Sequence, residues 1–368
     1  MYIPPEPVIS PLVFYKETRG GSITSPYLSY SPIFCSEGRS ALYLILKRSK
    51  LSIGDTVLLP AYLCDSIVNV VKKLGLNLRF YRVLENLEVD FDDLEAVAEK
   101  AKVLLIIHYF GFPQNMEEIL RFCKEKEILL IEDCAHALYS RWKGKYLGTF
   151  GDYGFFSLRK SLPSLDGGMF FISDKRISLD ESGSDCSQKE HSQPFSIFSL
   201  LIKYGEFGVG FTPRTFFRRF KSIRKGFIEY DATRKTNSLR GISKTSLSLL
   251  KITSEEKIVE KRRKNYFFLQ EHLQGFNNIK FLYPSLSEGV CPLCFPILTD
   301  NRDKIRINLL KKGINLRAFW DILPQEISSS DYSTSYQVAE KILLLPVHQS
   351  LDKRHLDYIE YSLKKVAY

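Results

Sequence analysis

A carboxylate, an imidazole and an amine occur together in residues 129–173, and their types and spacing could support chemistry. Asp133 ends the apolar run ILLIED, His136 follows it by three residues, and Lys160 precedes the pair Gly167-Gly168. A carboxylate at the end of a buried strand stays ionised only beside a positive partner. A lysine near a phosphate-binding turn and apolar walls is a candidate for Schiff-base formation with a carbonyl.

Two segments could hold a phosphate group. Gly38, Arg39 and Ser40 begin a helical segment, where backbone N–H groups and the positive end of the helix dipole attract anions. A simple helix N-cap explains this segment as well. Ser157, which ends another apolar run, could share the same phosphate. A cofactor with a phosphate, an aromatic ring and an aldehyde would use all these groups, and pyridoxal 5′-phosphate (PLP) has them.

Simpler explanations exist for the two central residues. Asp133 could be a helix N-cap that follows a strand, and Lys160 could be a surface residue of a loop. The glycine pair beyond Lys160 favours the joint explanation, but spacing alone leaves both open.

The elements that position these residues alternate in type between residues 37 and 133. Apolar strand-like runs at 56–59, 76–83, 102–111 and 128–133 are separated by helical segments. This alternation predicts an α/β domain with a parallel sheet wrapped by helices. Functional groups of such sheets gather beyond the carboxyl ends of the strands, and four residues lie there: His108, Gly111, Asp133 and His136.

The C-terminal third predicts a smaller α+β domain. Helical periodicity over 246–275 predicts one long helix that ends at Gly275. The segments that follow are a strand at 291–298, a helix at 302–313, a strand at 314–320, a helix and strand at 339–347 and a final helix at 352–368. We predict a large cofactor domain over residues 1–240, with a proline-rich N-terminal arm, and a small domain over 241–368.

Composition indicates a globular protein and excludes several classes. Hydrophobic residues make up 44% and charged residues 26%. No apolar run reaches the ~18 residues of a spanning helix, and no secretory signal is visible. The cysteines number seven, an odd and scattered set that favours the reducing cytoplasm. The motif Cys291-x-x-Cys294 lacks further ligands, so we expect no metal.

The net charge is +10, which indicates either a basic surface that keeps the protein in solution or an anionic substrate or membrane surface as a partner. Arginines and lysines cluster with phenylalanine in residues 214–225, but no nucleic-acid motif accompanies them. Residues 195–228 could form amphipathic helices. A peripheral membrane contact, a lid and a dimer surface all remain open for that segment.

The chain resembles the DegT-type (DegT/DnrJ/StrS) sugar-nucleotide aminotransferases, which are PLP enzymes of aspartate-aminotransferase fold type I. The resemblance covers residues 35–170 and 300–365. It rests on a linked series of motifs: Gly38-Arg39-Ser40-Ala41-Leu42, Leu59-Pro60-Ala61-Tyr62, His108-Tyr109-Phe110-Gly111, Ile131-Glu132-Asp133-Cys134-Ala135-His136-Ala137, Lys160 before Gly167-Gly168, and Leu344-Leu345-Pro346-Val347-His348. It implies a mostly parallel seven-stranded sheet in the large domain, and a homodimer.

The resemblance also implies roles for individual residues. Lys160 would carry the cofactor as a Schiff base and shuttle a proton during transfer. Asp133 would keep the ring nitrogen protonated, and His136 would pack over the ring face. Ser157 and the backbone N–H groups of residues 38–40 would hold the phosphate.

The chain departs from the family pattern at several positions. Lys160 is the third residue after Ser157, where the family lysine is the fifth, and Asp166 replaces a glutamate before the glycine pair. Cys64 stands where an aromatic residue often stacks on the ring, and Tyr62 is a substitute candidate for that contact. The family's Asn-x-Arg segment has no clear counterpart.

The predicted function is amino transfer from an amino acid, by resemblance glutamate, to a nucleotide-linked keto-sugar. The product would enter surface polysaccharide or amino-sugar biosynthesis. Two alternatives remain: a PLP enzyme acting on another carbonyl substrate, including a dehydratase, and a non-catalytic relative that serves polysaccharide assembly. Related dehydratases replace the lysine with histidine, so Lys160 argues against that branch. The sugar, the position of amination and its stereochemistry do not follow from the sequence.

Overall fold

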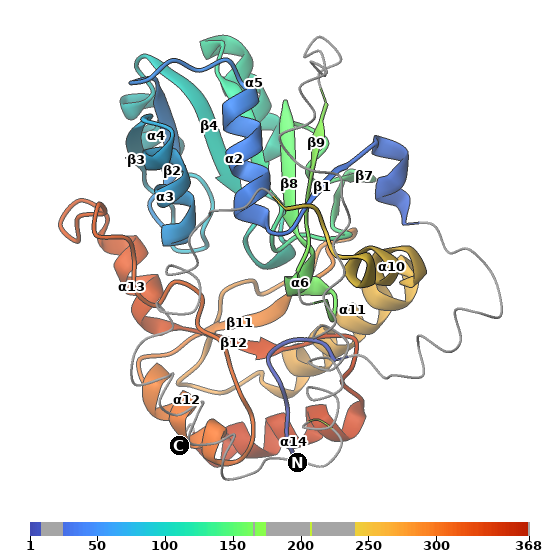
Figure 1. Cartoon of the computed structure of the whole chain (residues 1–368). Coiled ribbons are helices and arrows are strands. Elements are labelled where there is room, and N and C mark those ends of the chain that lie inside the picture. Colours follow the sequence, from blue (N-terminus) through green and yellow to red (C-terminus); the bar gives the residue numbers. More distant parts are fainter. Residues whose placement is uncertain (9–24, 165, 174–206, 208–239, 367–368) are drawn as a thin grey trace.

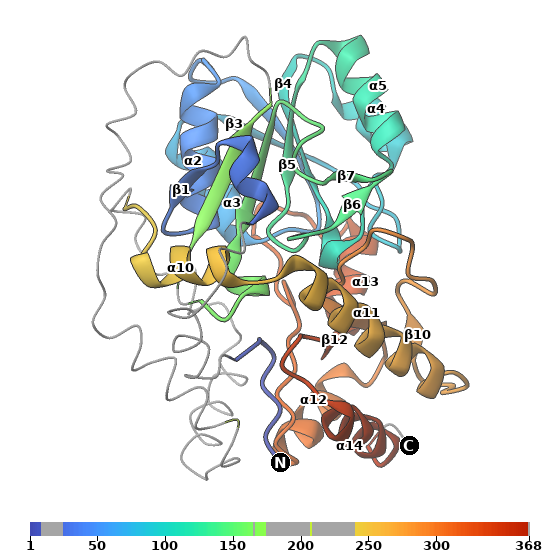
Figure 2. The ribbon, with the colours of Figure 1, turned by 90° about the vertical axis from the view of Figure 1, so that its right-hand side faces the viewer.

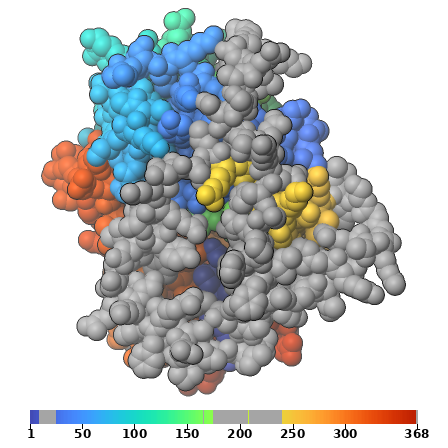
Figure 3. Space-filling model, in the orientation of Figure 1, coloured from blue at the N-terminus to red at the C-terminus, as the bar shows by residue number. Residues whose placement is uncertain are grey.

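The computed structural model describes residues 1–8, 25–164, 166–173, 207 and 240–366 (Figure 1). A seven-stranded sheet forms the upper part of the molecule, and a three-stranded sheet lies below it. On the face shown in Figure 3, most of the blue and cyan atoms lie in the upper part, the orange and red atoms lie beside and below them, and dark blue atoms of the first residues lie among the orange and red ones.

The large sheet has the strand order β1-β9-β8-β5-β4-β2-β3. Its strands are β1 (Ile33–Cys35), β2 (Thr56–Pro60), β3 (Asn77–Tyr81), β4 (Ala101–Ile107), β5 (Leu129–Asp133), β8 (Tyr153–Ser157) and β9 (Gly168–Ile172). The four pairs from β3 to β8 are parallel, and β9 is antiparallel to both β8 and β1. The predicted mostly parallel, seven-stranded sheet is confirmed.

Helices cover both faces of this sheet, with α2 on one side and α4 and α5 on the other (Figure 2). They are α2 (Gly38–Arg48), α3 (Asp65–Lys73), α4 (Phe91–Val97) and α5 (Met116–Lys126). The strand β2, which lies between β4 and the edge strand β3, is buried at every residue, and its apolar run therefore reflects burial on two faces. The N-cap side chains Asp90 and Asn115 accept backbone N–H bonds at the starts of α4 and α5.

The smaller sheet is antiparallel, in the order β10-β11-β12. Its elements and helices are β10 (Lys280–Phe281), β11 (Cys294–Leu298), β12 (Ile342–Pro346), α10 (Lys244–Ile252), α11 (Glu255–His272), α12 (Arg302–Lys311), α13 (Ser333–Lys341) and α14 (Lys353–Lys364). The strands and helices predicted at 291–298, 302–313, 339–347 and 352–368 are confirmed within a few residues.

Two predicted elements of the C-terminal part are wrong. The single helix over 246–275 is divided between α10 and α11, because Thr253 is extended and the Ser254 hydroxyl accepts the backbone N–H of Lys257. The strand over 314–320 is absent: Ile314 and Arg317 form isolated bridges, and Phe319-Trp320 form a turn. Trp320 has φ +57°, a conformation that interrupts a strand.

The first residues of the chain lie against its C-terminal part. The backbone of Ile3 bonds to Gly313 and Asn315, each at 2.9 Å, and the Val8 N–H donates to the Ser350 hydroxyl at 3.0 Å. The N-terminal arm therefore joins both parts of the chain. The division at residue 240 stays a prediction.

The segment 195–228 lies outside the described residues, except for Phe207, which stacks on His355 with ring centroids 4.9 Å apart. The membrane, lid and dimer hypotheses for that segment stay predictions. Among the described residues, no helix combines the length and the apolar character needed to span a bilayer.

Candidate active site

Asp133 is held at the carboxyl end of a central strand. It is the last residue of β5, which lies between the parallel strands β4 and β8, and its side chain is only 4% exposed. One carboxylate oxygen accepts the Ala135 N–H at 2.8 Å. Burial raises the pKa of Asp133 to about 6, although the charge of Lys160 acts in the opposite direction. The side chain therefore lacks full charge compensation and suits a cationic partner.

Lys160 and His136 are in direct contact. Lys160 lies on α6 (Leu158–Ser161), a single turn that follows β8, and its Nζ is 3.0 Å from His136 Nε2. The Phe110 N–H points at the other ring nitrogen, at 3.4 Å. Burial, followed by the charges of Lys160 and Arg317, lowers the pKa of His136 well below its usual value. His136 is thus a neutral, flat ring beside the amine.

The two predicted phosphate-binding segments meet. A Cβ placed on Gly38 would lie 3.3 Å from Ser157 Cβ, so the start of α2 touches the end of β8. The N-cap residue Glu37 accepts no first-turn bond with its side chain and pairs with Arg39 at 2.6 Å. Ser40 is 7% exposed, as is Ser157. This helix start and the serine form one potential anion site.

The short turn between Ser157 and Lys160 does not separate these groups. Residues 158–161 form α6, so one helical turn carries the chain from the phosphate segment to the lysine. The departure from the family spacing is therefore compatible with a shared site.

Tyr62 and Cys64 have different positions in this region. The Tyr62 side chain is fully buried, and its hydroxyl donates to the Phe319 carbonyl at 2.7 Å. Burial raises the pKa of Tyr62. Cys64 is half-buried at the start of α3, with its sulfur 3.1 Å from the Ser66 hydroxyl. The Tyr62 hydroxyl thus contacts the segment that contains Phe319, whereas the Cys64 sulfur contacts Ser66 of α3.

Two aromatic residues of the segment predicted as a strand, Phe319 and Trp320, cover one side of the site. Phe319 and Trp320 stack on the His136 ring at centroid distances of 4.8 and 5.2 Å. Lys160 Nζ lies 5.2 Å from the centroid of Phe319 and 6.0 Å from that of Trp320. The C-terminal part of the chain thus supplies the walls around the amine. The one sign of this role in the sequence is that two aromatic residues, Phe319 and Trp320, are adjacent.

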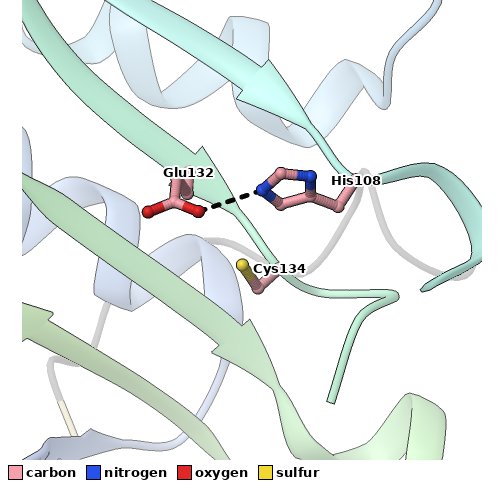
Figure 4. Close-up of side chains that lie close together, drawn as sticks. All are labelled: His108, Glu132 and Cys134. Carbon is pink, nitrogen blue, oxygen red and sulfur yellow. Dashed lines mark hydrogen bonds and ion pairs between the residues drawn. The ribbon is translucent and has the colours of Figure 1, made fainter. Parts of the chain in front are cut away.

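A second buried cluster contains His108 and the two neighbours of Asp133 in the chain, Glu132 and Cys134 (Figure 4). Glu132 Oε2 is 3.0 Å from His108 Nε2, and both side chains are fully buried. Because the Gln114 N–H donates to His108 Nδ1 at 3.2 Å, Nε2 carries the proton and donates to Glu132.

The Glu132 carboxylate is already saturated with donors. It accepts three backbone N–H groups, from Gly148 at 2.8 Å, Phe150 at 2.7 Å and Gly151 at 2.7 Å. These bonds use the oxygen atoms that a metal would need. We therefore assign the cluster to anchoring residues 148–151 under β5, next to Asp133.

The donor set of the site fits PLP. A buried carboxylate matches a protonated ring nitrogen, an amine matches an aldehyde, and a serine at a helix start matches a phosphate. The neutral His136 ring belongs to an aromatic stack with Phe110, Phe319 and Trp320, and a cofactor ring that packs on it would replace one of these contacts. Lys160, Asp133 and His136 lie together, and Ser157 joins them to residues 38–40 through α6.

Known proteins share this sequence and fold. Residues 30–182 match the model of the DegT/DnrJ/EryC1/StrS aminotransferase family. The chain is 35% identical over 349 residues to the dTDP-4-dehydro-2,3,6-trideoxy-D-glucose 4-aminotransferase of Saccharopolyspora spinosa. The aligned region covers 91% of this chain and 84% of that enzyme. It is 36% identical to GDP-perosamine synthase of Escherichia coli O157:H7 over 146 residues, which are 39% of this chain and 40% of that protein.

The fold also has solved counterparts. A Streptococcus pneumoniae protein described as a sugar aminotransferase, in its PLP form, superposes with a TM-score of 0.74 at 20% identity, over 100% of this chain and 99% of its own. This likeness shows the fold. The 35% identity over most of the S. spinosa enzyme shows that the chain belongs to the DegT/DnrJ/EryC1/StrS aminotransferase family. The predicted enzyme class, a PLP-dependent aminotransferase, is confirmed.

Proposed function

We propose that this chain binds PLP on Lys160 and transfers an amino group from glutamate to the keto group of a nucleotide-linked sugar. The product would enter surface polysaccharide or amino-sugar biosynthesis. The observation that carries this proposal is the contact of Lys160 with His136 at 3.0 Å, beside the buried Asp133. An amine, an imidazole and a buried carboxylate that lie together support the assignment of these residues to one cofactor.

Each residue has a physical task in this proposal. Bound PLP supplies an electron sink that stabilises negative charge at the carbon next to the transferred nitrogen. A cationic ring nitrogen beside Asp133 offsets the burial that raises the pKa of that carboxyl, so Asp133 stays ionised and keeps the nitrogen protonated. The Lys160 amine takes a proton from one carbon and returns it to another. Phe319 and Trp320 place apolar rings near the amine and reduce its contact with water.

The sugar substrate is supported by the relatives. The S. spinosa enzyme is named for a dTDP-linked 4-dehydro sugar, and the E. coli relative is named for a GDP-linked amino sugar. A net charge of +10 favours a diphosphate-bearing substrate. Lys160 favours amino transfer over dehydration, because related dehydratases carry histidine at that position.

A two-stage assay tests the function. The PLP-loaded protein is first mixed with glutamate, and the cofactor absorbance is followed as it takes the amino form. A panel of dTDP- and GDP-linked keto-sugars is then added, and aminated products are detected by mass spectrometry. We expect one panel member to restore the starting spectrum and gain an amino group. A protein that binds PLP and reacts with glutamate but aminates only other carbonyl compounds would contradict the sugar assignment, and one that binds no PLP would be a non-catalytic relative.

We further propose a cytoplasmic homodimer. In the family that this chain resembles, both subunits complete each site. The six cysteines that the structure describes are free thiols, which supports a reducing compartment. Sedimentation at micromolar concentration should give the mass of a dimer, and a monomer that is fully active would refute this part.

A further inference from the structure

Arg262 of α11 is a buried cation whose hydrogen-bond acceptors, within the described part of the chain, are all neutral. The residue is buried, with 1% of its surface exposed. The guanidinium donates from Nε to Gln349 Oε1 at 2.9 Å, from Nη1 to the Pro292 carbonyl at 3.1 Å and from Nη2 to the Ser161 carbonyl at 2.9 Å. Burial lowers its pKa. Burying a charge without an opposite charge is expensive, so this arrangement calls for a functional reason.

One of these acceptors adjoins the catalytic lysine. Ser161 is the last residue of α6 and follows Lys160 directly. Its carbonyl also accepts Gln349 Nε2 at 3.1 Å, so two side chains from the C-terminal part hold one carbonyl. Helix ends leave carbonyl groups without partners in the helix, and a single turn has little stability of its own. External donors must therefore set the position of α6.

The other end of this segment is fixed within the large sheet. The Leu158 N–H donates to the Gly167 carbonyl at 2.9 Å, and the Gly167 N–H donates to the Ser36 carbonyl at 2.7 Å. The turn that carries Lys160 is thus held at its start by the large sheet and at its end by Arg262. Because Arg262 also binds the Pro292 carbonyl, it connects α6 with a second segment of the C-terminal part.

We propose that Arg262 is a positioning residue for Lys160. It fixes the end of α6 so that the amine lies beside His136, and it couples the placement of that amine to the C-terminal part, which also supplies Phe319 and Trp320. The inference rests on the proposed role of Lys160 as the cofactor-binding residue. Misplacement of a reacting group by ~1 Å can cost about 100-fold in rate, so loss of this connection should appear in kinetics.

The neighbouring Arg263 provides a matched control. It lies on the same helix, and its Nη1 donates to the carbonyls of Ser287 and Val290, each at 2.8 Å. Neither acceptor belongs to α6. Arg262→Met and Arg263→Met therefore each remove one guanidinium and its carbonyl bonds, but only the first touches the turn that carries Lys160.

The test uses the full chain and measures cofactor attachment apart from turnover. Cofactor-free protein is mixed rapidly with PLP, attachment is followed by absorbance, and borohydride trapping with peptide mapping locates the modified residue. Urea unfolding of each variant gives its stability. The single-turnover reaction of the PLP-loaded protein with increasing glutamate concentrations gives a limiting rate and a half-saturating concentration, which serve here as kcat and KM.

We expect Arg262→Met to slow attachment and to lower kcat by about 10- to 100-fold, with the glutamate KM within about 2-fold of the wild type. Arg263→Met should stay within about 2-fold of the wild type in every kinetic value. Arg262→Lys, which keeps a donor and the charge, should recover part of the rate. Gln349→Ala, which removes one of the two donors to Ser161, should slow attachment by a smaller factor.

Two outcomes would overturn the inference. One is a folded Arg262→Met protein that attaches PLP at the wild-type rate. The other is an equal loss in Arg262→Met and Arg263→Met, which would indicate stability alone. If Arg262→Met does not fold, Gln349→Ala decides, and an unchanged attachment rate in that variant overturns the inference. Wild-type protein that attaches no PLP at Lys160 would instead refute the proposed function.

Discussion

Replacement of Asp133 by asparagine should stabilise the cofactor-free protein while damaging its function. The carboxyl is 4% exposed, and burial raises its pKa from 3.8 to about 6. A raised pKa in the folded state means that ionisation destabilises the fold. The contribution of the protonated acid to stability is fully present below pH 3.8 and is lost as the pH rises through about 6. The amide of the Asp133→Asn variant would keep an oxygen to accept the Ala135 N–H without carrying a charge.

The size of the effect follows from the pKa difference. A difference of about 2 units corresponds to about 3 kcal/mol, at 1.36 kcal/mol per unit. Asp133→Asn should therefore raise the free energy of unfolding by about 3 kcal/mol near pH 7.5 and by only about 1 kcal/mol near pH 4.5. The difference should grow between these values and level off above the folded pKa.

Urea unfolding of cofactor-free wild type and Asp133→Asn across this pH range measures the effect. Repeating it with the same excess of PLP provides the control, because a ligand stabilises the folded state by an amount that grows with the logarithm of its affinity. PLP should stabilise the wild type by about 2 kcal/mol more than the variant, since a charged hydrogen bond to the ring nitrogen is lost. A variant that is no more stable than the wild type near pH 7.5 would refute the account of Asp133 as a poorly compensated buried charge.

Three further changes test other parts of the structure. Glu132→Gln should lower the free energy of unfolding by about 2–4 kcal/mol, because a side-chain N–H would face backbone N–H groups. Urea unfolding measures this loss, with the exposed Glu117→Gln as the control. Equal unfolding midpoints for the two variants would contradict the anchoring role of Glu132. Gly38→Ala should weaken PLP binding by about 10-fold in an absorbance titration, because its Cβ would crowd Ser157 at 3.3 Å; unchanged affinity would remove this helix start from the site. PLP binding should quench the fluorescence of Trp320, whose ring centroid lies 6.0 Å from Lys160 Nζ. The Trp320→Phe variant should lose most of this quenching. Quenching that persists in the variant, through the other tryptophan, would place the cofactor elsewhere.

The sequence predicted the parts of the fold that local patterns determine. The strands β2, β4 and β5 are buried at most of their residues, so each contains an apolar run of at least three residues between helical segments. A parallel sheet then brings the ends of distant strands to one edge. For that reason Asp133, His136 and Lys160 could be selected together before any contact was known.

Contacts between distant segments had no comparable signal. Arg262 lies 101 residues from the carbonyl it binds on α6, and its surroundings have only the helical periodicity of α11. Phe319 and Trp320 occur in an irregular turn, where no period indicates which way a side chain points. The division of the helix at Thr253-Ser254 had a local cause, hydroxyl side chains that compete with the helix backbone, but the continuous periodicity on either side concealed it.

The central claim is that Lys160 holds the cofactor and transfers the proton. Borohydride reduction of the PLP-loaded wild type, followed by peptide mapping, tests it most directly, with Lys160→Ala as the comparison. The account predicts one modified residue, Lys160, and a variant that folds with the wild-type circular dichroism spectrum but shows neither attachment nor amino transfer. Modification at another lysine, or full amino transfer by Lys160→Ala, would contradict it.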